Sequence, residues 1–282
     1  MMMQRQNEGY LSRFRRIAAQ DGWSRAMEKA VEFVQAHLGI TGGLGRRRII
    51  LSKRLFNRLG GVVRRGPFAG LNIRLDATWG AGDRAGMLLG LYEKEVVETV
   101  ADALRTRPVF IDIGAADGYY AVGVLKAGLA KRSIAFEMNP KARASIKALA
   151  ELNGVQDDLE IHSAADAGSL TSLSVESFDR CMVLCDIEGA EVFVLNDDAL
   201  KLLSQAVIVV EIHDHEDMDE HQVEKILRDR AAPIFDVQSF TTGARSPLQI
   251  EEISDLTEDD QWLICSEGRK YRQTWLVFRP KS

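Results

Sequence analysis

A strand, a glycine turn, a helix and a second strand that ends in an acid constrain the fold of this chain most strongly. Residues 109–118 read V-F-I-D-I-G-A-A-D-G, a short apolar run followed by a turn between Gly114 and Gly118. Residues 134–139 read I-A-F-E-M-N, and their acid, Glu137, follows Asp112 by 25 residues. This order is typical of a doubly wound α/β sheet whose second strand ends in an acid that binds the ribose of an adenosine ligand. Glycine in the turn lets the backbone approach that ligand closely.

The composition of the turn indicates which adenosine ligand fits. A dinucleotide turn has the pattern G-x-G-x-x-G and seats a pyrophosphate on the N-terminus of the helix. Here only two glycines are present, and Asp117 lies inside the turn, where it would repel a pyrophosphate. The acid favours a ligand with a cationic amino group and no phosphate, and S-adenosylmethionine has both properties. A βαβ unit without a ligand is the alternative, but it explains the glycines and leaves Asp117 and Glu137 unexplained.

Length and composition are those of an ordinary globular chain. The 282 residues suffice for one large domain, or for one domain with an extension, and 46% of them are hydrophobic. No apolar run approaches the ~20 residues of a membrane span, and the first ten residues lack the apolar core of a secretory signal. Of the three cysteines, we interpret Cys181 and Cys185 as small hydrophobic residues of a buried strand. The expected location is a reducing cytoplasm.

Charge is distributed unevenly along the chain. Residues 1–66 contain 14 basic and 4 acidic residues, a net charge of +10, whereas the rest of the chain carries −15. A basic segment beside an acidic body indicates either a polyanionic partner, such as nucleic acid, a phosphorylated glycan or a membrane surface, or docking of the segment on its own acidic body.

The N-terminal part of the chain is expected to be mainly helical. Apolar residues from Trp23 to Leu38 recur at helical spacing, and the glycines of residues 39–45 predict a hinge after that helix. Residues 46–58 predict a basic amphipathic helix, and residues 60–80 predict a small hairpin or two short strands. A long helix is expected over residues 86–105, and Pro108 ends it.

From residue 108 onward, strands and helices alternate, which predicts an α/β fold with a parallel sheet. The predicted strands are 109–113, 133–137, 159–162, 180–186, 206–212, 234–240 and 274–278, the last of them antiparallel. The predicted helices are 119–126, 140–153 and 219–230. Asn139 and Pro140 provide an N-cap and a proline at the first helical position.

Polar residues gather at the carboxyl ends of these strands, where open α/β sheets bind their ligands. The residues concerned are Asp112, Gly114, Asp117, Glu137, Ser163, Asp166, Asp186, Glu188, Glu191, Glu211 and His213. Solvated strand ends also favour acids, so each acid taken singly has a simpler explanation. For Glu137, the spacing from the glycine turn favours the ribose.

Methyl transfer requires alignment of the acceptor oxygen with the methyl group and removal of the acceptor proton. His213 is the best base by residue type, because its ordinary pKa is near neutrality, and Asp186 and Glu188 are its rivals. Alternatively, Asp186, Glu211 and His213 hold a divalent ion that acidifies the hydroxyl. Oxygen ligands suit Mg²⁺, but no spacing demands a metal, and none is predicted.

Four motifs in this order make the chain resemble the FkbM family of S-adenosylmethionine-dependent methyltransferases. They are F-I-D-I-G-A-A-D-G-Y-Y-A at 110–121, F-E-M-N-P at 136–140, C-D-I-E-G-A-E at 185–191 and V-V-E-I-H at 209–213. The resemblance covers residues 108–280 and implies a seven-stranded Rossmann-like methyltransferase fold, with helices on both faces of a mostly parallel sheet. We expect two parts of the chain: an N-terminal basic extension of helices and a small hairpin, residues 1–82, and a methyltransferase domain, residues 83–282.

The resemblance also assigns site residues. It implies that Asp186, Glu188, Glu211 and His213 face the transferred methyl group and are catalytic. The residues that it implies for cofactor binding are Tyr92, Glu93, Asp112, Gly114, Ala115, Ala116, Asp117, Gly118, Glu137, Met138, Asn139, Ala165, Asp166 and Asp186. Family members commonly have asparagine at the position of Asp117. Tyr92 and Glu93 belong to L-L-G-L-Y-E-K-E at 88–95, which with G-P-F-A-G-L at 66–71 looks like the extension of one bacterial branch of the family.

The acceptor is less constrained than the cofactor. The resemblance implies O-methylation of a hydroxyl on a sugar, a glycan or a secondary metabolite. An RNA or other nucleic-acid methyltransferase that uses the basic N-terminal region is the second hypothesis. A protein that binds the cofactor without transferring its methyl group is the third.

Overall fold

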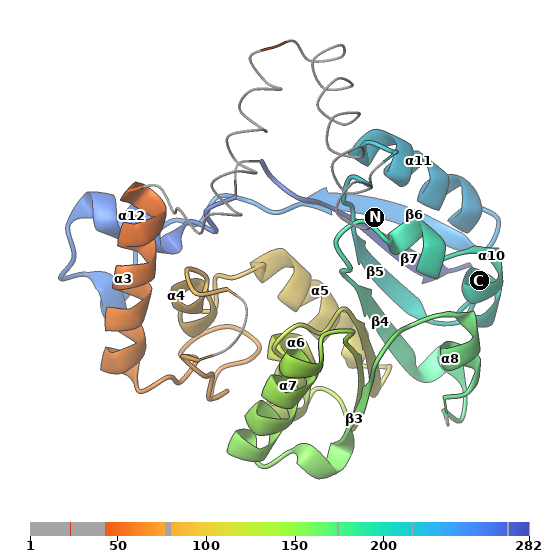
Figure 1. Cartoon of the computed structure of the whole chain (residues 1–282), viewed down its shortest axis with the longest axis horizontal. Helices are drawn as coiled ribbons and strands as arrows, with labels where there is room; N and C mark the ends of the chain where they lie inside the picture. The colour runs from red at the N-terminus through yellow and green to blue at the C-terminus, as the bar shows by residue number, and fades with distance from the viewer. Residues whose placement is uncertain are drawn as a thin grey trace, which may run out of the picture.

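The computed structural model describes Trp23 and residues 43–76, 80–173, 175–215, 217–269 and 271–281. Seven strands form one sheet in the order β3-β2-β1-β4-β5-β7-β6 (Figure 1). The strands are β1 (Val109–Ile113), β2 (Arg132–Phe136), β3 (Leu159–His162), β4 (Cys181–Cys185), β5 (Val207–Glu211), β6 (Phe235–Thr241) and β7 (Thr274–Pro280). Strands β1 to β5 pair with one another in parallel, and β7 lies antiparallel between β5 and β6.

Helices cover both faces of the sheet. They are α3 (Gly43–Leu59), α4 (Arg84–Leu88), α5 (Lys94–Leu104), α6 (Tyr119–Lys126), α7 (Pro140–Asn153), α8 (Ala167–Thr171), α9 (Glu191–Val194), α10 (Asp197–Leu202), α11 (Glu220–Ala231) and α12 (Glu258–Cys265), with 3₁₀ turns η1 (Gln156–Asp158), η2 (Phe178–Arg180) and η3 (Glu251–Ile253). Helices α5, α6 and α7 lie on one face, and α8, α10 and α11 lie on the other (Figure 1). None of the described helices combines the length and the apolar character needed to cross a lipid bilayer.

The two faces form two hydrophobic cores because side chains alternate along each strand. In β1, Phe110 packs into the core beneath α5 and α6, whereas Ile111 and Ile113 pack into the opposite core. Every residue of β4 and β5 is buried, as expected for central strands covered on both sides.

The position of β1 determines where a ligand can bind. The chain runs outward from β1 through β2 to β3, and it then returns to the other side of β1 as β4. Such a reversal of strand order opens a crevice at the carboxyl ends of the two central strands. With the antiparallel β7 inserted next to β5, the order is that of the Rossmann-like methyltransferase fold, which confirms the predicted fold class.

All seven predicted strands, and the predicted helices within residues 108–280, are present with bounds that differ by at most two residues. The long helix predicted over residues 86–105 is wrong, because the chain forms α4 and α5 with a turn between them. In that turn Gly90 has φ +66°, and a Cβ there would lie 2.3 Å from the carbonyl oxygen of Arg65. Glu93 also has a left-handed φ, of 43°. Close contact with the segment around Arg65 therefore overrides the helical pattern.

Two further predictions for the N-terminal part are corrected. The expected hinge over residues 39–45 is helical in the part that the structure describes, since α3 already begins at Gly43. The expected hairpin over residues 60–80 is reduced, among residues 60–76 and 80, to one antiparallel bridge between Val62 and Asn72. The side chain of Asn153 holds Asn72 through its backbone N–H and carbonyl groups. The helix predicted before residue 39 lies outside the described residues, apart from Trp23.

The basic helix α3 forms as predicted and lies beside α12 (Figure 1). Its buried positions include Leu51, Leu55 and Leu59, which recur at the helical spacing of four residues. Arg47 Nη2 donates to Asp260 Oδ2 at 2.8 Å, and Arg58 Nη1 donates to Asp255 Oδ1 at 2.8 Å. Helix α3 is therefore bound to acidic residues of its own chain.

Candidate active site

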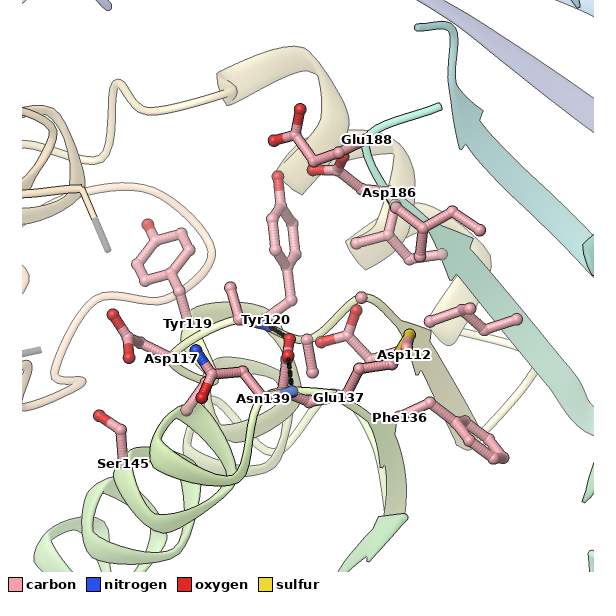
Figure 2. A pocket seen from close by; sticks show the side chains of 18 of the residues that line it. Asp112, Asp117, Tyr119, Tyr120, Phe136, Glu137, Asn139, Ser145, Asp186 and Glu188 are labelled. Atoms are coloured by element: carbon pink, nitrogen blue, oxygen red, sulfur yellow. Dashed lines mark hydrogen bonds between the residues drawn. The ribbon is translucent and has the colours of Figure 1, made fainter. Parts of the chain in front are cut away.

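A cavity of about 410 Å³ opens at the carboxyl ends of β1, β2 and β4. Its floor is the glycine turn after β1, and its walls come from the ends of β2 and β4 and the loop after β3. Residues of the turn between α4 and α5, Tyr92 and Glu93, also line it. Figure 2 shows Asp186 and Glu188 at one end of the site, and Asn139 and Ser145 at the other.

The glycine turn has a shape that other residues would not allow. Gly114 has φ +93°, and a Cβ there would lie 1.8 Å from the carbonyl oxygen of Asp186. Gly118 has φ +90° and caps α6, and its added Cβ would lie 3.2 Å from Ile146. The two glycines thus bring the turn against β4 and α7 and leave space above it for a ligand.

The Glu137 carboxylate is fixed at the edge of the cavity by two backbone amides. Ala116 N–H donates to its Oε2 at 2.9 Å, and Asn139 N–H donates to its Oε1 at 2.7 Å (Figure 2). A carboxylate has about four acceptor positions, so two remain for a ligand. The side chain of Asn139 also accepts from Lys141 N–H and caps α7, which anchors this part of the site to a helix.

Asp112 is a second carboxylate in the cavity, and it is almost completely buried. The residue is 2% exposed, and its Oδ2 has no hydrogen-bond partner. Burial raises the pKa of Asp112 to about 7, against the opposing effect of a hydrogen bond from the Ala121 backbone. A buried carboxyl with a free oxygen that borders the cavity is a candidate contact for a cationic ligand group.

Asp117 borders the cavity together with two arginines, Arg74 and Arg84. Arg84 is 4% exposed, and its Nε donates to the carbonyl oxygen of Arg74 at 2.9 Å. Burial lowers the pKa of Arg84, and the Asp117 carboxylate counteracts that lowering. This end of the cavity therefore offers both a carboxylate and a guanidinium, which suits a ligand that carries an amino group and a carboxylate. The sequence patterns considered above did not single out either arginine.

A second group of polar residues surrounds His213 at the ends of β4 and β5. Its Nδ1 lies 2.8 Å from Glu191 Oε1, and its Nε2 lies 3.7 Å from Asp186 Oδ1 and 3.6 Å from Glu211 Oε1. Burial lowers the pKa of His213, but the Glu191 hydrogen bond and the Glu211 carboxylate outweigh it and raise the pKa to about 9. In this arrangement the imidazole is protonated at neutral pH, so it must lose that proton before it can act as a base.

Asp186 connects this group with the cavity. Burial and the negative charges of Glu211 and Glu93 raise the pKa of Asp186 well above its ordinary range. The turn between α4 and α5 contributes Glu93, which is 1% exposed and accepts a hydrogen bond from Tyr120 Oη at 2.7 Å. Arg269 connects this turn with β5, because its guanidinium contacts both Glu93 and Glu211.

The structure brings most of the sequence-predicted site residues to one cavity. The predicted residues that line it are Tyr92, Glu93, Asp112, Gly114, Ala115, Ala116, Asp117, Glu137, Met138, Asn139, Ala165, Asp186 and Glu188. Gly118 lies beneath it as the N-cap of α6. Glu211 and His213 do not line it and reach it through Asp186. Asp166 does not line it either, since its carboxylate caps α8 by accepting from Ser169 N–H at 2.7 Å.

No protein-family model and no curated protein matches this chain. Solved structures with a similar fold include the O-methyltransferase TomG from Streptomyces achromogenes in complex with SAM, which is 17% identical over 83% of this chain and 90% of its own, with a TM-score of 0.47. An O-methyltransferase from Bacillus cereus in complex with SAH is 14% identical over 89% of this chain and 97% of its own, with a TM-score of 0.47.

The B. subtilis tRNA methyltransferase TrmK is 14% identical over 66% of this chain and 65% of its own, with a TM-score of 0.42. This chain thus spans just under two thirds of the length of TrmK. At 14–17% identity, these similarities concern the fold alone.

Proposed function

We propose that this chain is an S-adenosylmethionine-dependent methyltransferase. The observation that carries the proposal is the Glu137 carboxylate, which two backbone amides hold at the edge of the cavity directly above the glycine turn. A carboxylate at the end of the second strand of such a sheet is suited to accept two hydrogen bonds from ribose hydroxyls. The cavity, of about 410 Å³, lies in the usual size range of small-molecule sites.

The remaining walls fit the other parts of the cofactor. Asp117 and Arg84 would bind the amino and carboxylate groups of its methionine part, and Asp112 would face the same cationic end. Phe136 and Met138 provide apolar surface for an adenine ring. When bound, the cofactor supplies a methyl group activated by a positively charged sulfur.

We propose O-methylation of a hydroxyl on a sugar, a glycan or a secondary metabolite, as the resemblance to the FkbM family implies. Asp186 and Glu188 line the cavity, so Asp186 would bind the acceptor hydroxyl and Glu188 would take its proton. Glu211 and His213 act on the acceptor through Asp186, whose Oδ1 lies 3.7 Å from His213 Nε2.

Cofactor binding and methyl transfer are tested in two steps. Calorimetry with S-adenosylmethionine and with its demethylated product should show one site per chain. Transfer of a labelled methyl group into fractions of a cell extract, treated with glycosidase, nuclease or neither, then identifies the acceptor class. Absence of cofactor binding would refute the methyltransferase assignment. Label found only in nuclease-sensitive material would refute the glycan and metabolite assignment.

The nucleic-acid hypothesis depended on a basic segment that is free to bind a polyanion. In the described part of that segment, Arg47, Arg58 and Arg65 pair with acids of residues 252–260, and Arg48 pairs with Asp83. These pairs favour docking of the segment on the chain itself. RNA binding at low salt that weakens when residues 46–48 are neutralised would restore the hypothesis.

A further inference from the structure

Three donor atoms converge behind the cavity, at the carboxyl ends of β4 and β5. Asp186 directly follows β4, Glu211 ends β5, and His213 follows two residues later. One oxygen of each acid and one imidazole nitrogen lie within 4.8 Å of one another. A cation with bonds of about 2.1 Å holds its ligand atoms up to about 4.2 Å apart, so small side-chain rotations would close this group around an ion.

The orientation of the imidazole is fixed from behind by a buried acid. Glu191 is completely buried, and its Oε1 accepts from Gly189 N–H at 3.1 Å and contacts His213 Nδ1 at 2.8 Å. Because Nδ1 is occupied in this way, Nε2 is directed at Asp186 and Glu211. A histidine that binds a metal through one nitrogen and a carboxylate through the other is the usual arrangement of a metal site.

The two candidate oxygen ligands, Asp186 and Glu211, also have surroundings that suit a metal site. Asp186 Oδ1 is buried and has no hydrogen-bond partner. Glu211 is held by Arg269, whose Nη1 donates to its Oε1 at 2.6 Å, and ligating carboxylates commonly accept such a second bond. Arg269 also contacts Glu93 and Glu267, so its single positive charge is shared among three acids. The acids around His213, among them Asp186, Glu188 and Glu191, therefore outnumber the cationic side chains beside them.

We propose that Asp186, Glu211 and His213 bind a divalent cation at the inner end of the cavity, with Glu191 as the positioning residue for the imidazole. Two carboxylates and one imidazole suit a hard or borderline ion such as Mg²⁺ or Mn²⁺. Asp186 lines the cavity, so the ion is within reach of a bound acceptor. Its role in catalysis, which rests on the proposed methyltransferase function, is to bind the acceptor oxygen and lower the pKa of its hydroxyl.

Mn²⁺ is the probe for this site, because its binding is followed by electron paramagnetic resonance. The full-length chain, without a histidine tag and treated with a chelator, is titrated with Mn²⁺ in the absence of S-adenosylmethionine. One equivalent should bind well below about 1 mM, and Mg²⁺ should compete. The spin-echo spectrum of bound Mn²⁺ should show coupling to one imidazole nitrogen.

Three variants and one control separate a built site from a diffuse acidic surface. Asp186→Asn and His213→Gln should each weaken Mn²⁺ binding at least tenfold, and His213→Gln should abolish the nitrogen coupling. Glu191→Gln should weaken binding by roughly 10- to 100-fold, although Glu191 cannot touch the ion. His221→Ala, an exposed position on α11, should bind like the wild type. Circular dichroism and melting temperatures confirm that each variant is folded.

The proposal is overturned if the wild-type chain binds no Mn²⁺, or if folded Asp186→Asn and His213→Gln bind it as the wild type does. A separate titration with S-adenosylmethionine, done without Mn²⁺, reports on the proposed function. If the chain binds the metal but not the cofactor, the metal site stands and the methyltransferase assignment is refuted. If it binds the cofactor but not the metal, the methyltransferase assignment stands and the metal site is refuted.

Discussion

Replacement of Glu137 by alanine tests the cofactor assignment most directly. In the structure, both carboxylate oxygens of Glu137 accept a backbone N–H, from Ala116 and from Asn139. The carboxylate is therefore already in place before a ligand binds, and ordering the side chain costs little at that step. The alanine variant removes the charged acceptor of the ribose hydroxyls and leaves the two N–H groups to water.

The expected loss follows from the number of hydrogen bonds. A hydrogen bond to a charged group contributes about 1.5–3 kcal/mol. Two ribose bonds would therefore supply at least about 3 kcal/mol, and partial replacement of these bonds by water reduces the expected loss to about 1.5–3 kcal/mol. The dissociation constant for S-adenosylmethionine should thus rise by roughly 10- to 150-fold in Glu137→Ala.

Calorimetry with S-adenosylhomocysteine and its 2′-deoxy analogue makes the test specific. The wild-type chain should bind the deoxy analogue more weakly, and Glu137→Ala should bind the two compounds almost equally. Glu160→Ala is the matched control, because Glu160 pairs with Arg132 on the adjacent strand and is 43% exposed. The ribose assignment would be refuted if folded Glu137→Ala bound S-adenosylmethionine as tightly as the wild type does. It would also be refuted if the variant and the wild type discriminated between the two analogues to the same extent.

Three further predictions concern stability. The pKa of Asp112 is raised to about 7, so the folded state holds a proton that the unfolded state has lost between about pH 4 and 7. The free energy of unfolding, measured with urea, should therefore fall for the wild type relative to Asp112→Asn as the pH rises through this window, by at most about 4 kcal/mol. A difference between the two proteins that stays constant with pH would contradict this reasoning. Gly114→Ala should cost more than about 4 kcal/mol or prevent folding, because its Cβ would lie 1.8 Å from a carbonyl oxygen. Gly128→Ala, with a similar φ of +67° and open space around it, should cost only about 1–2 kcal/mol by chemical denaturation. Arg48→Ala should lower the melting temperature, because the variant loses the ion pair with Asp83, which contributes about 1–2 kcal/mol to stability. RNA binding, measured by fluorescence anisotropy, should not change. Weakened RNA binding would contradict the docked state of the basic helix.

The elements around the site followed from local sequence patterns. The run V-F-I-D-I, the glycines at 114 and 118, and the caps Asn139 and Gly154 each specify backbone geometry within a few residues. Such signals act between neighbours in the chain, which is why β1, α6, α7 and β3 were predicted with the bounds that the structure has. The short helices α8, α9, α10 and α12 have between four and eight residues, too few for a clear helical period, and the sequence did not reveal them.

The site itself required both kinds of information. The sequence placed Asp112, Glu137 and Asp186 at strand ends, and parallel strands bring such ends together. It did not indicate that Arg84 borders the same cavity, because Arg84 comes from a segment outside the sheet. Nor did it assign Glu191 a role, since its partner His213 is 22 residues away, and only the tertiary fold brings the first residue of α9 against the segment that follows β5.

By itself, the sequence determined the α/β class, the glycine turn and the acid that faces it, because alternation, turn chemistry and strand spacing are properties of contiguous residues. The tertiary structure decided the break between α4 and α5, the pairing of α3 with residues 252–260 and the grouping of four acids around His213. Each of these depends on burial and on charges brought together from distant parts of the chain. Such contacts stabilise the protein only once the sheet has formed, so a sequence pattern within one segment cannot predict them.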